Sequence, residues 1–125
     1  LAIIDTGAPT TSVAPAVVKK LGLHQTGVEK MDLPGAAGPQ DLPKYGVHIE
    51  VQGLGHKLPV TEAVEIPWRD ENCGVVLGRD FLRWSVFIYN GIAGNCVLTF
   101  HDGRQIAGFQ SVAGEHNPEF YRPVG

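Results

Sequence analysis

One carboxylate, that of Asp5, stands where an apolar run ends in a glycine turn. Leu1-Ala2-Ile3-Ile4 precedes it, and Thr6-Gly7-Ala8 follows it. This apolar run, with β-branched Ile3 and Ile4, predicts a buried strand. Gly7 permits a sharp turn, and the Thr6 hydroxyl can lock that turn. A carboxylate at the end of a buried strand is costly unless it is hydrogen-bonded or used in chemistry. Asp5 is therefore the first candidate for a functional group, the alternative being a hydrogen-bonded core aspartate.

Patterns for other kinds of chemistry are not present in the sequence. The five histidines are scattered without zinc-ligand spacing, and no phosphate-binding glycine loop or Gly-x-Ser-x-Gly elbow occurs. Nothing in the sequence places a base near Cys73 or Cys96. These two cysteines could pair with each other or remain buried thiols. We therefore expect no metal and no cofactor.

The elements that must position Asp5 belong to a chain of 125 residues, a length that predicts one domain. Sixteen glycines and nine prolines favour many turns and a β-rich fold. The net charge of −3 argues against a nucleic-acid surface and against a polybasic membrane anchor. No apolar run is long enough to predict a membrane-spanning segment. No signal peptide is visible, so the cytoplasm is the default expectation for localisation.

Pro15 and Gly22 bracket a predicted short helix, with Val17, Val18 and Leu21 facing the core. Alternating apolar residues predict a strand over residues 45–51. Further short strands are expected at 28–33, 58–66, 73–78, 86–89, 96–100 and 104–109, and one or two helical turns at 79–84, with Phe81, Leu82 and Trp84 facing inward. These elements predict an all-β fold, a small barrel or sandwich with one or two short helices.

Small residues fill the segment Pro34-Gly35-Ala36-Ala37-Gly38-Pro39, which is the expected tip of a hairpin. A tip of glycine and alanine has no large side chains to pack. It is either a plain mobile loop or a lid whose backbone groups approach a ligand closely.

Two segments together carry a resemblance to a known family. Asp5-Thr6-Gly7-Ala8, followed by Thr10-Thr11-Ser12-Val13, resembles the active-site turn of aspartic proteases. About seventy residues downstream, Val75-Val76-Leu77-Gly78-Arg79-Asp80-Phe81-Leu82 resembles the apolar-apolar-Gly-Arg-Asp/Asn-x-Leu segment of retropepsin-like, single-domain aspartic proteases. The glycine-alanine tip sits between them, where that family carries its flap. The resemblance covers Leu1 to about Phe100 and is to bacterial or cellular members.

The resemblance implies a small closed β-barrel of the retropepsin type that spans residues 1–125 and is active as a two-fold homodimer. Each chain would supply one Asp5, and the two carboxylates would share a proton and activate a water against a peptide bond. The substrate would be an extended peptide or protein.

The resemblance also implies roles for residues around the catalytic Asp5. Thr6 would reach across the two-fold axis, and Gly7 and Ala8 would present backbone to the substrate. The remaining assignments are a substrate-binding flap of Gly35, Ala36, Ala37 and Gly38, a support loop of Val76, Leu77, Gly78 and Arg79, and Phe81 and Leu82 packing beneath that loop.

Two departures from the family pattern are visible. Retroviral members usually have an acidic residue two positions after the motif glycine, where it partners the arginine of the downstream segment. This chain has Pro9 there, which leaves the partner of Arg79 open. Only four residues precede Asp5, where the family usually has a hairpin, so we expect that hairpin to be missing or replaced by another segment.

Three hypotheses therefore follow from the sequence. The favoured one is a homodimeric aspartic endopeptidase. The second is a catalytically inactive, retropepsin-like module for dimerisation or peptide binding. The third is a small β-domain in which Asp-Thr-Gly is incidental.

Overall fold

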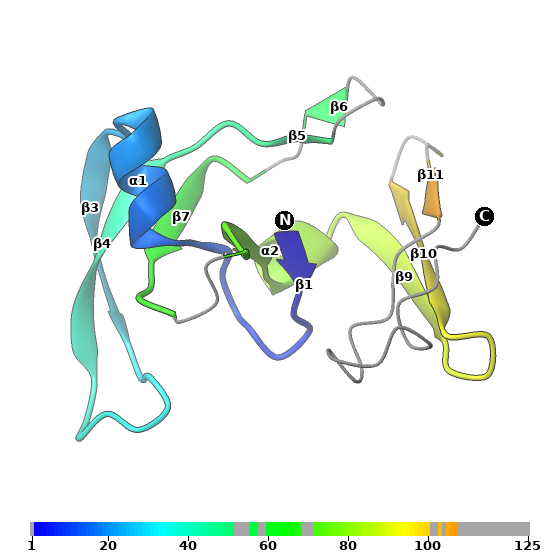
Figure 1. Cartoon of the computed structure of the whole chain (residues 1–125), viewed down its shortest axis with the longest axis horizontal. Helices are drawn as coiled ribbons and strands as arrows, with labels where there is room; N and C mark the ends of the chain where they lie inside the picture. Colours follow the sequence, from blue (N-terminus) through cyan, green and yellow to red (C-terminus); the bar gives the residue numbers. More distant parts are fainter. Residues whose placement is uncertain are drawn as a thin grey trace. The chain divides into compact units, whose positions relative to one another are not determined.

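The computed structural model of the chain describes residues 2–51, 56–57, 60–68, 72–100, 103 and 105–107. These residues form short strands and two short helices, so the mostly β fold class is confirmed (Figure 1). The chain divides into two compact units, Leu1–Phe81 and Leu82–Gly125. No helix of the described part is long and apolar enough to cross a membrane.

The first unit is built on a six-stranded sheet. In spatial order its strands are β1 (Ala2–Ile4), β8 (Val75–Leu77), β2 (Ser12–Val13), β7 (Glu62–Glu65), β4 (Gln40–Gly46) and β3 (Gln25–Met31). Strand β8 runs parallel to β1 and antiparallel to β2. Strand β7 is parallel to β2 and antiparallel to β4, which pairs with β3 in a hairpin. The core side chains include Val13, Leu42, Ala63, Val64, Leu77 and Phe81.

Strand β1 ends this sheet instead of lying inside it. Ala2 is exposed, and Ile3 and Ile4 are only half-buried. The buried strand predicted before Asp5 is therefore wrong in its burial, although the β conformation is confirmed. The reason is position: β1 pairs with β8 on one side and stands at the end of the described strand order.

Helix α1 (Pro15–Leu21) forms where the sequence predicts it. Gly22 ends it in the left-handed conformation, with φ of 60°, and its N–H bonds the Val18 carbonyl. The predicted core face is only partly confirmed. Val17 and Val18 are half-buried, but Leu21 is 65% exposed.

The strand predicted over residues 45–51 is wrong in its extent. Strand β4 begins at Gln40 and ends at Gly46. Beyond it the Val47 N–H donates to the Thr61 carbonyl, outside the regular ladder. The chain then forms β5 (Glu50–Val51), which pairs with β6 (His56–Lys57) in a separate two-stranded sheet. The alternation of apolar residues in the sequence thus spans two strands, β4 and β5, that belong to different sheets.

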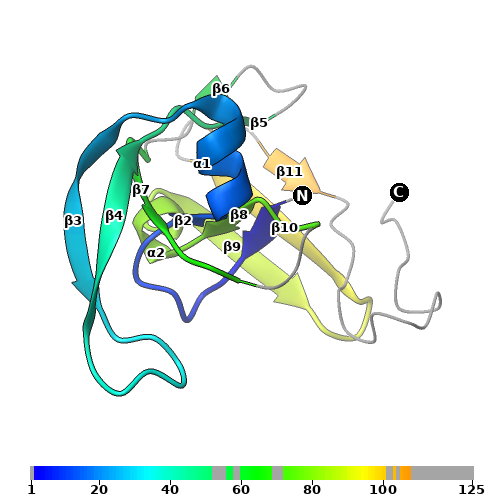
Figure 2. The ribbon, with the colours of Figure 1, turned by 60° about the vertical axis from the view of Figure 1, so that its left-hand side comes forward.

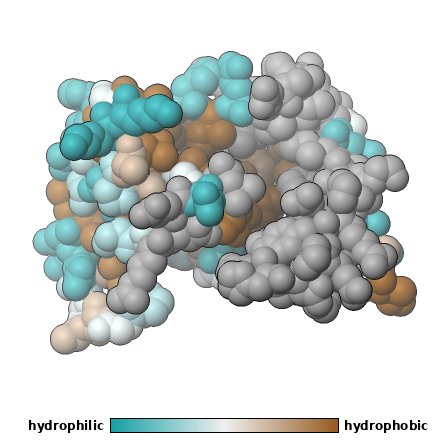
Figure 3. Space-filling model, in the orientation of Figure 1, coloured by the Kyte–Doolittle hydropathy of each residue, from teal (hydrophilic) through white to brown (hydrophobic). Residues whose placement is uncertain are grey.

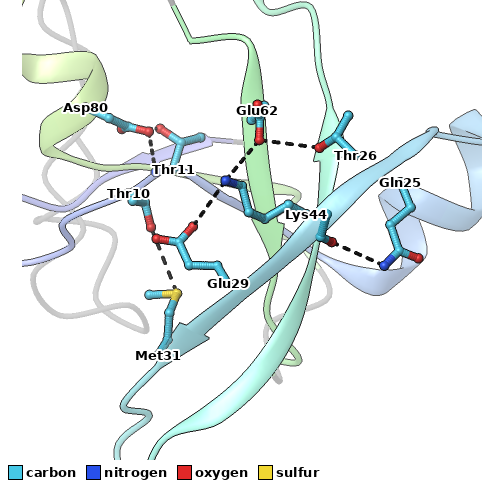
Figure 4. A network of polar contacts seen from close by, with 10 residues as sticks. Thr10, Thr11, Gln25, Thr26, Glu29, Met31, Lys44, Glu62 and Asp80 are labelled. Atoms are coloured by element: carbon cyan, nitrogen blue, oxygen red, sulfur yellow. Dashed lines mark hydrogen bonds and ion pairs between the residues drawn. The ribbon is translucent and has the colours of Figure 1, made fainter.

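Residues 32–39 connect β3 to β4 and extend beyond the ends of both strands (Figure 2). Across the hairpin and the neighbouring β7, Lys44 joins three strands. Its Nζ lies 3.0 Å from Glu62 Oε2 and 4.0 Å from Glu29 Oε2 (Figure 4). The hydrogen bond to Glu62, followed by the charges of Glu62 and Glu29, raises the pKa of Lys44. This network connects β3, β4 and β7 at a partly exposed position, where ion pairs contribute little to stability.

The second unit contains an antiparallel sheet in the order β11 (Gln105–Ala107), β10 (Asn95–Phe100), β9 (Ser85–Asn90). The predicted hairpin at residues 90–95 is confirmed, and Asn90 Oδ1 accepts the N–H groups of Ile92 and Ala93 in its turn. Leu98 and Phe100 are buried, whereas Trp84 is 46% exposed, so its predicted inward position is wrong.

The closed barrel expected from the resemblance is not seen in the described residues. Their strands form three separate sheets, and the largest has β1 and β3 as its two ends. Closure would need hydrogen bonds between these end strands, and the described pairings contain none.

Cys73 is buried and its thiol donates to the Val75 carbonyl at 3.3 Å. Partial burial raises the pKa of the Cys96 thiol.

Candidate active site

The parallel pairing of β1 and β8 brings the two resembling segments together. Ile4 lies opposite Leu77 in the register, so Asp5 and Gly78 leave the same end of the sheet on neighbouring strands. The Asp5 N–H continues the ladder by donating to the Leu77 carbonyl at 2.9 Å. Residues that are far apart in the sequence thereby form one small structure.

Asp5 to Ala8 forms a tight turn that is closed twice by hydrogen bonds. The Ala8 N–H donates to the Asp5 carbonyl at 3.2 Å, and the Gly7 N–H donates to Asp5 Oδ1 at 2.9 Å. The second bond is the local aspartate-to-backbone bond that fixes such turns. Among the described residues nothing bonds Oδ2 or the Thr6 hydroxyl. Asp5, Thr6 and Gly7 are exposed, so the carboxylate expected to be buried faces outward.

Gly78 lies against the backbone at the end of this turn and just beyond it. A Cβ built at this position would lie 2.6 Å from the carbonyl carbon and oxygen of Thr10 and 2.9 Å from the Ala8 oxygen. Real Cβ atoms essentially never come so close to backbone. Glycine is therefore required here because the two backbones touch.

Arg79 starts helix α2 (Arg79–Leu82) and is bonded to the turn by both its backbone and its side chain. Its N–H donates to the Ala8 carbonyl at 2.9 Å. Its Nη1 donates to the carbonyls of Thr6 at 3.2 Å and Gly7 at 3.1 Å. With Pro9 in place of an acidic residue, these backbone oxygens are the partners of Arg79.

Thr11 and Asp80 form a second connection that the sequence reasoning did not assign. Asp80 Oδ1 accepts the Thr11 hydroxyl at 2.7 Å, and Oδ2 accepts the Thr11 N–H at 2.9 Å (Figure 4). The Thr11 oxygen in turn accepts the Gly78 N–H at 3.3 Å, and Thr11 is fully buried. Asp80 Oδ1 also accepts the Phe81 N–H at 2.8 Å. The only sequence signal was that both residues lie within the two resembling segments.

The other predicted support residues lie on strand β8 and helix α2. Val76 is the middle residue of β8, opposite Ile3 on one side and Ser12 on the other. Leu77 and Phe81 are buried, and Leu82 is half-buried.

Gly35, Ala36, Ala37 and Gly38 lie together in the loop between β3 and β4. Gly35 and Gly38 have φ of 81° and 146°, and the Ala36 N–H bonds the Leu33 carbonyl at 3.1 Å. The loop surface is pale in Figure 3, neither strongly hydrophilic nor strongly hydrophobic. Within the described part of the chain, no hydrogen bond joins this loop to the Asp5–Ala8 turn. At the end of β3, where the loop begins, the Thr10 hydroxyl lies 4.0 Å from Met31 Sδ.

No group of three or more histidine, cysteine, aspartate or glutamate side chains that could hold a metal ion is found among the described residues. The exposed polar groups of the site are the Asp5 carboxylate, the Thr6 hydroxyl and the Arg79 guanidinium, while the Thr11 hydroxyl and the Asp80 carboxylate bond each other. Such a set can exchange a proton through Asp5 and offer backbone hydrogen bonds.

Comparison with known proteins agrees with this geometry. A family model described as aspartyl protease matches residues 1–81. That range coincides with the first compact unit and contains the turn, the loop and the support segment. No curated protein matches the chain. The family model covers well over half of the sequence, and the chain belongs to the aspartyl protease family.

Proposed function

We propose that this protein is a retropepsin-like aspartic endopeptidase that works as a homodimer. The observation that carries the proposal is the state of Asp5. One carboxylate oxygen is fixed by the Gly7 N–H, while the other faces outward without a described partner. A group held in this way has a defined direction and a free oxygen for a water or for a second carboxylate.

The second carboxylate comes from another copy of the chain in this proposal. The sequence contains one Asp-Thr-Gly, whereas the reaction needs two carboxylates that share one proton. One carboxylate removes a proton from water as the water oxygen attacks the peptide carbonyl carbon. The other donates its proton to the carbonyl oxygen, which gives a tetrahedral gem-diol. When this intermediate collapses, the first carboxylate passes its newly gained proton to the leaving nitrogen and the second takes a proton back from a hydroxyl. The C–N bond breaks, and an amine and a carboxylic acid are released. The pair titrates as one unit.

The exposed turn supports association of two copies. The Thr6 hydroxyl has no described partner within its own chain and is free to bond the turn of a second chain. The loop of residues 35–38 would close over an extended peptide and add strand-like hydrogen bonds.

The test is cleavage of a mixed peptide library between about pH 4 and 7, the range in which a carboxylate dyad works. Parent protein is compared with Asp5→Asn. Asp41→Asn is the matched control because the Asp41 side chain is exposed and makes a long ion pair with Lys30, with 3.9 Å between Oδ1 and Nζ. We expect Asp5→Asn to lower kcat/KM at least about 100-fold with unchanged folding. Cleavage by Asp5→Asn at the parent rate would reject the endopeptidase.

Mixing tests the dimer directly. If each active site needs two Asp5 carboxylates, equal amounts of parent and Asp5→Asn leave only about one quarter of randomly paired dimers active. Activity proportional to the parent protein alone would contradict a shared site. Peptide binding without cleavage by the parent would instead favour the inactive module.

A further inference from the structure

Arg79 donates to three successive backbone carbonyls, those of Thr6, Gly7 and Ala8. Its Nη1 bonds the first two and its own N–H bonds the third. The N–H groups of the first two of these peptide groups point toward Asp5. The Gly7 N–H donates to Asp5 Oδ1, and the Ala8 N–H donates to the Asp5 carbonyl. The two peptide groups between Thr6 and Ala8 therefore have Arg79 at their oxygen ends and Asp5 at their nitrogen ends.

This arrangement has an electrostatic consequence. A guanidinium is always protonated, and each peptide group has a dipole with its negative end at the oxygen. Hydrogen bonds in a chain polarise one another. The charge of Arg79 therefore strengthens the bond from the Gly7 N–H to the Asp5 carboxylate, although the guanidinium does not touch that carboxylate.

We propose that Arg79 is a positioning residue that fixes the direction of the Asp5 carboxylate through the Thr6–Gly7 and Gly7–Ala8 peptide groups. In this chain the guanidinium orders the turn through main-chain oxygens, since Pro9 offers no carboxylate for it to pair with. The catalytic consequence rests on the proposed endopeptidase, whereas the effect on the turn does not depend on catalysis.

The first test measures amide hydrogen exchange of the full chain in the parent, Arg79→Lys and Arg79→Met. Bonds to charged groups are the stronger ones, but Arg79 is exposed and solvent weakens its effect. We therefore expect the protection of the Gly7 and Ala8 amides to fall about tenfold in Arg79→Met. Arg79→Lys, which keeps the charge on a shorter side chain, should lie between the two.

The Asp5 amide is an internal control because it bonds the Leu77 carbonyl in the sheet and not the turn. General destabilisation by Arg79→Met would lower the protection of all three amides together. Loss at Gly7 and Ala8 alone supports the proposal, while unchanged or uniformly lowered protection overturns it. If Arg79→Met does not fold, the comparison of Arg79→Lys with the parent decides in the same way.

The second test measures kcat and KM with a cleaved peptide. We expect Arg79→Met to lower kcat about tenfold, to leave KM nearly unchanged, and to be partly rescued in Arg79→Lys. Arg83→Met is the matched control, since Arg83 is an exposed arginine that lies over the Trp84 ring, 5.2 Å from its centre. A parent that cleaves nothing would reject the endopeptidase, and the exchange experiment would still decide whether Arg79 orders the turn.

Discussion

The Asp5–Ala8 turn and the loop of residues 32–39 both contain glycine and alanine, but they are held in different ways. The turn is bonded to Leu77 and Arg79, and its backbone touches Gly78. The loop has one backbone bond across its tip, from Ala36 to Leu33, and open space around its glycines. The turn is bonded to a segment about seventy residues away, whereas the hydrogen bond of the loop among the described residues is within the loop itself.

This difference matches what the two regions would do in a protease. A carboxylate that exchanges protons needs a fixed direction, and small displacements are costly for the rate. A flap must open for a substrate to enter and close over it afterwards. Small residues therefore serve close backbone contact in the turn and backbone freedom in the loop. Replacing glycine by alanine should therefore have different effects beside the turn, where it removes a close backbone contact, and in the loop, where it restricts the backbone.

The largest effect is expected from Gly78→Ala. The added Cβ would meet backbone atoms of Thr10 at 2.6 Å, and backbone cannot rotate away as a side chain can. We expect a loss of at least about 3 kcal/mol in the free energy of unfolding, measured by urea denaturation. Gly27→Ala is the control, since a Cβ there meets nothing within 4 Å. A loss of equal size in both variants would contradict the close contact between Gly78 and Thr10.

A smaller loss is expected from Thr11→Val, which keeps the shape of the side chain and removes its hydroxyl. Asp80 Oδ1 then loses a donor and the Gly78 N–H loses an acceptor at a fully buried position. We expect a loss of about 2 kcal/mol in thermal or urea unfolding. Thr10→Val is the matched control, because the Thr10 hydroxyl has only a 4.0 Å contact with a sulfur, and it should change stability by less than about 0.5 kcal/mol. A Thr11→Val protein as stable as the parent would show that the Thr11–Asp80 connection contributes little.

Local signals in the sequence predicted local structure well. Proline and glycine marked both ends of α1, and the Asn90 turn marked the β9–β10 hairpin. The Asp-Thr-Gly-Ala and Gly-Arg-Asp segments were found as a pair through a family resemblance. Their contact, however, depends on the pairing of β1 with β8, a register that neither segment contains by itself.

The features that the sequence did not predict also depend on residues that are distant in the sequence. The alternation of apolar residues over 45–51 predicted one strand, but the chain leaves one sheet after Gly46 and enters another at Glu50. Ile3 and Ile4 were expected to be buried because they are β-branched, but an edge strand buries less of each side chain. The partners of Arg79 are backbone oxygens, which have no side-chain signature in a sequence.

The smallest effect on folding, and the clearest separation of the two regions, is expected from Gly35→Ala. Gly35 has φ of 81° with nothing within 4 Å of a built Cβ, so the cost is backbone strain of about 1 kcal/mol. Gly22→Ala should cost a similar amount, since Gly22 has φ of 60° and equally open surroundings at the end of α1. The two variants should differ in catalysis: KM for a cleaved peptide should rise several-fold in Gly35→Ala alone, because only that strain lies in the proposed flap. Equal KM values in the two variants would mean that the loop does not contact the substrate. Substrate binding and cleavage would then depend on the Asp5 turn without the loop.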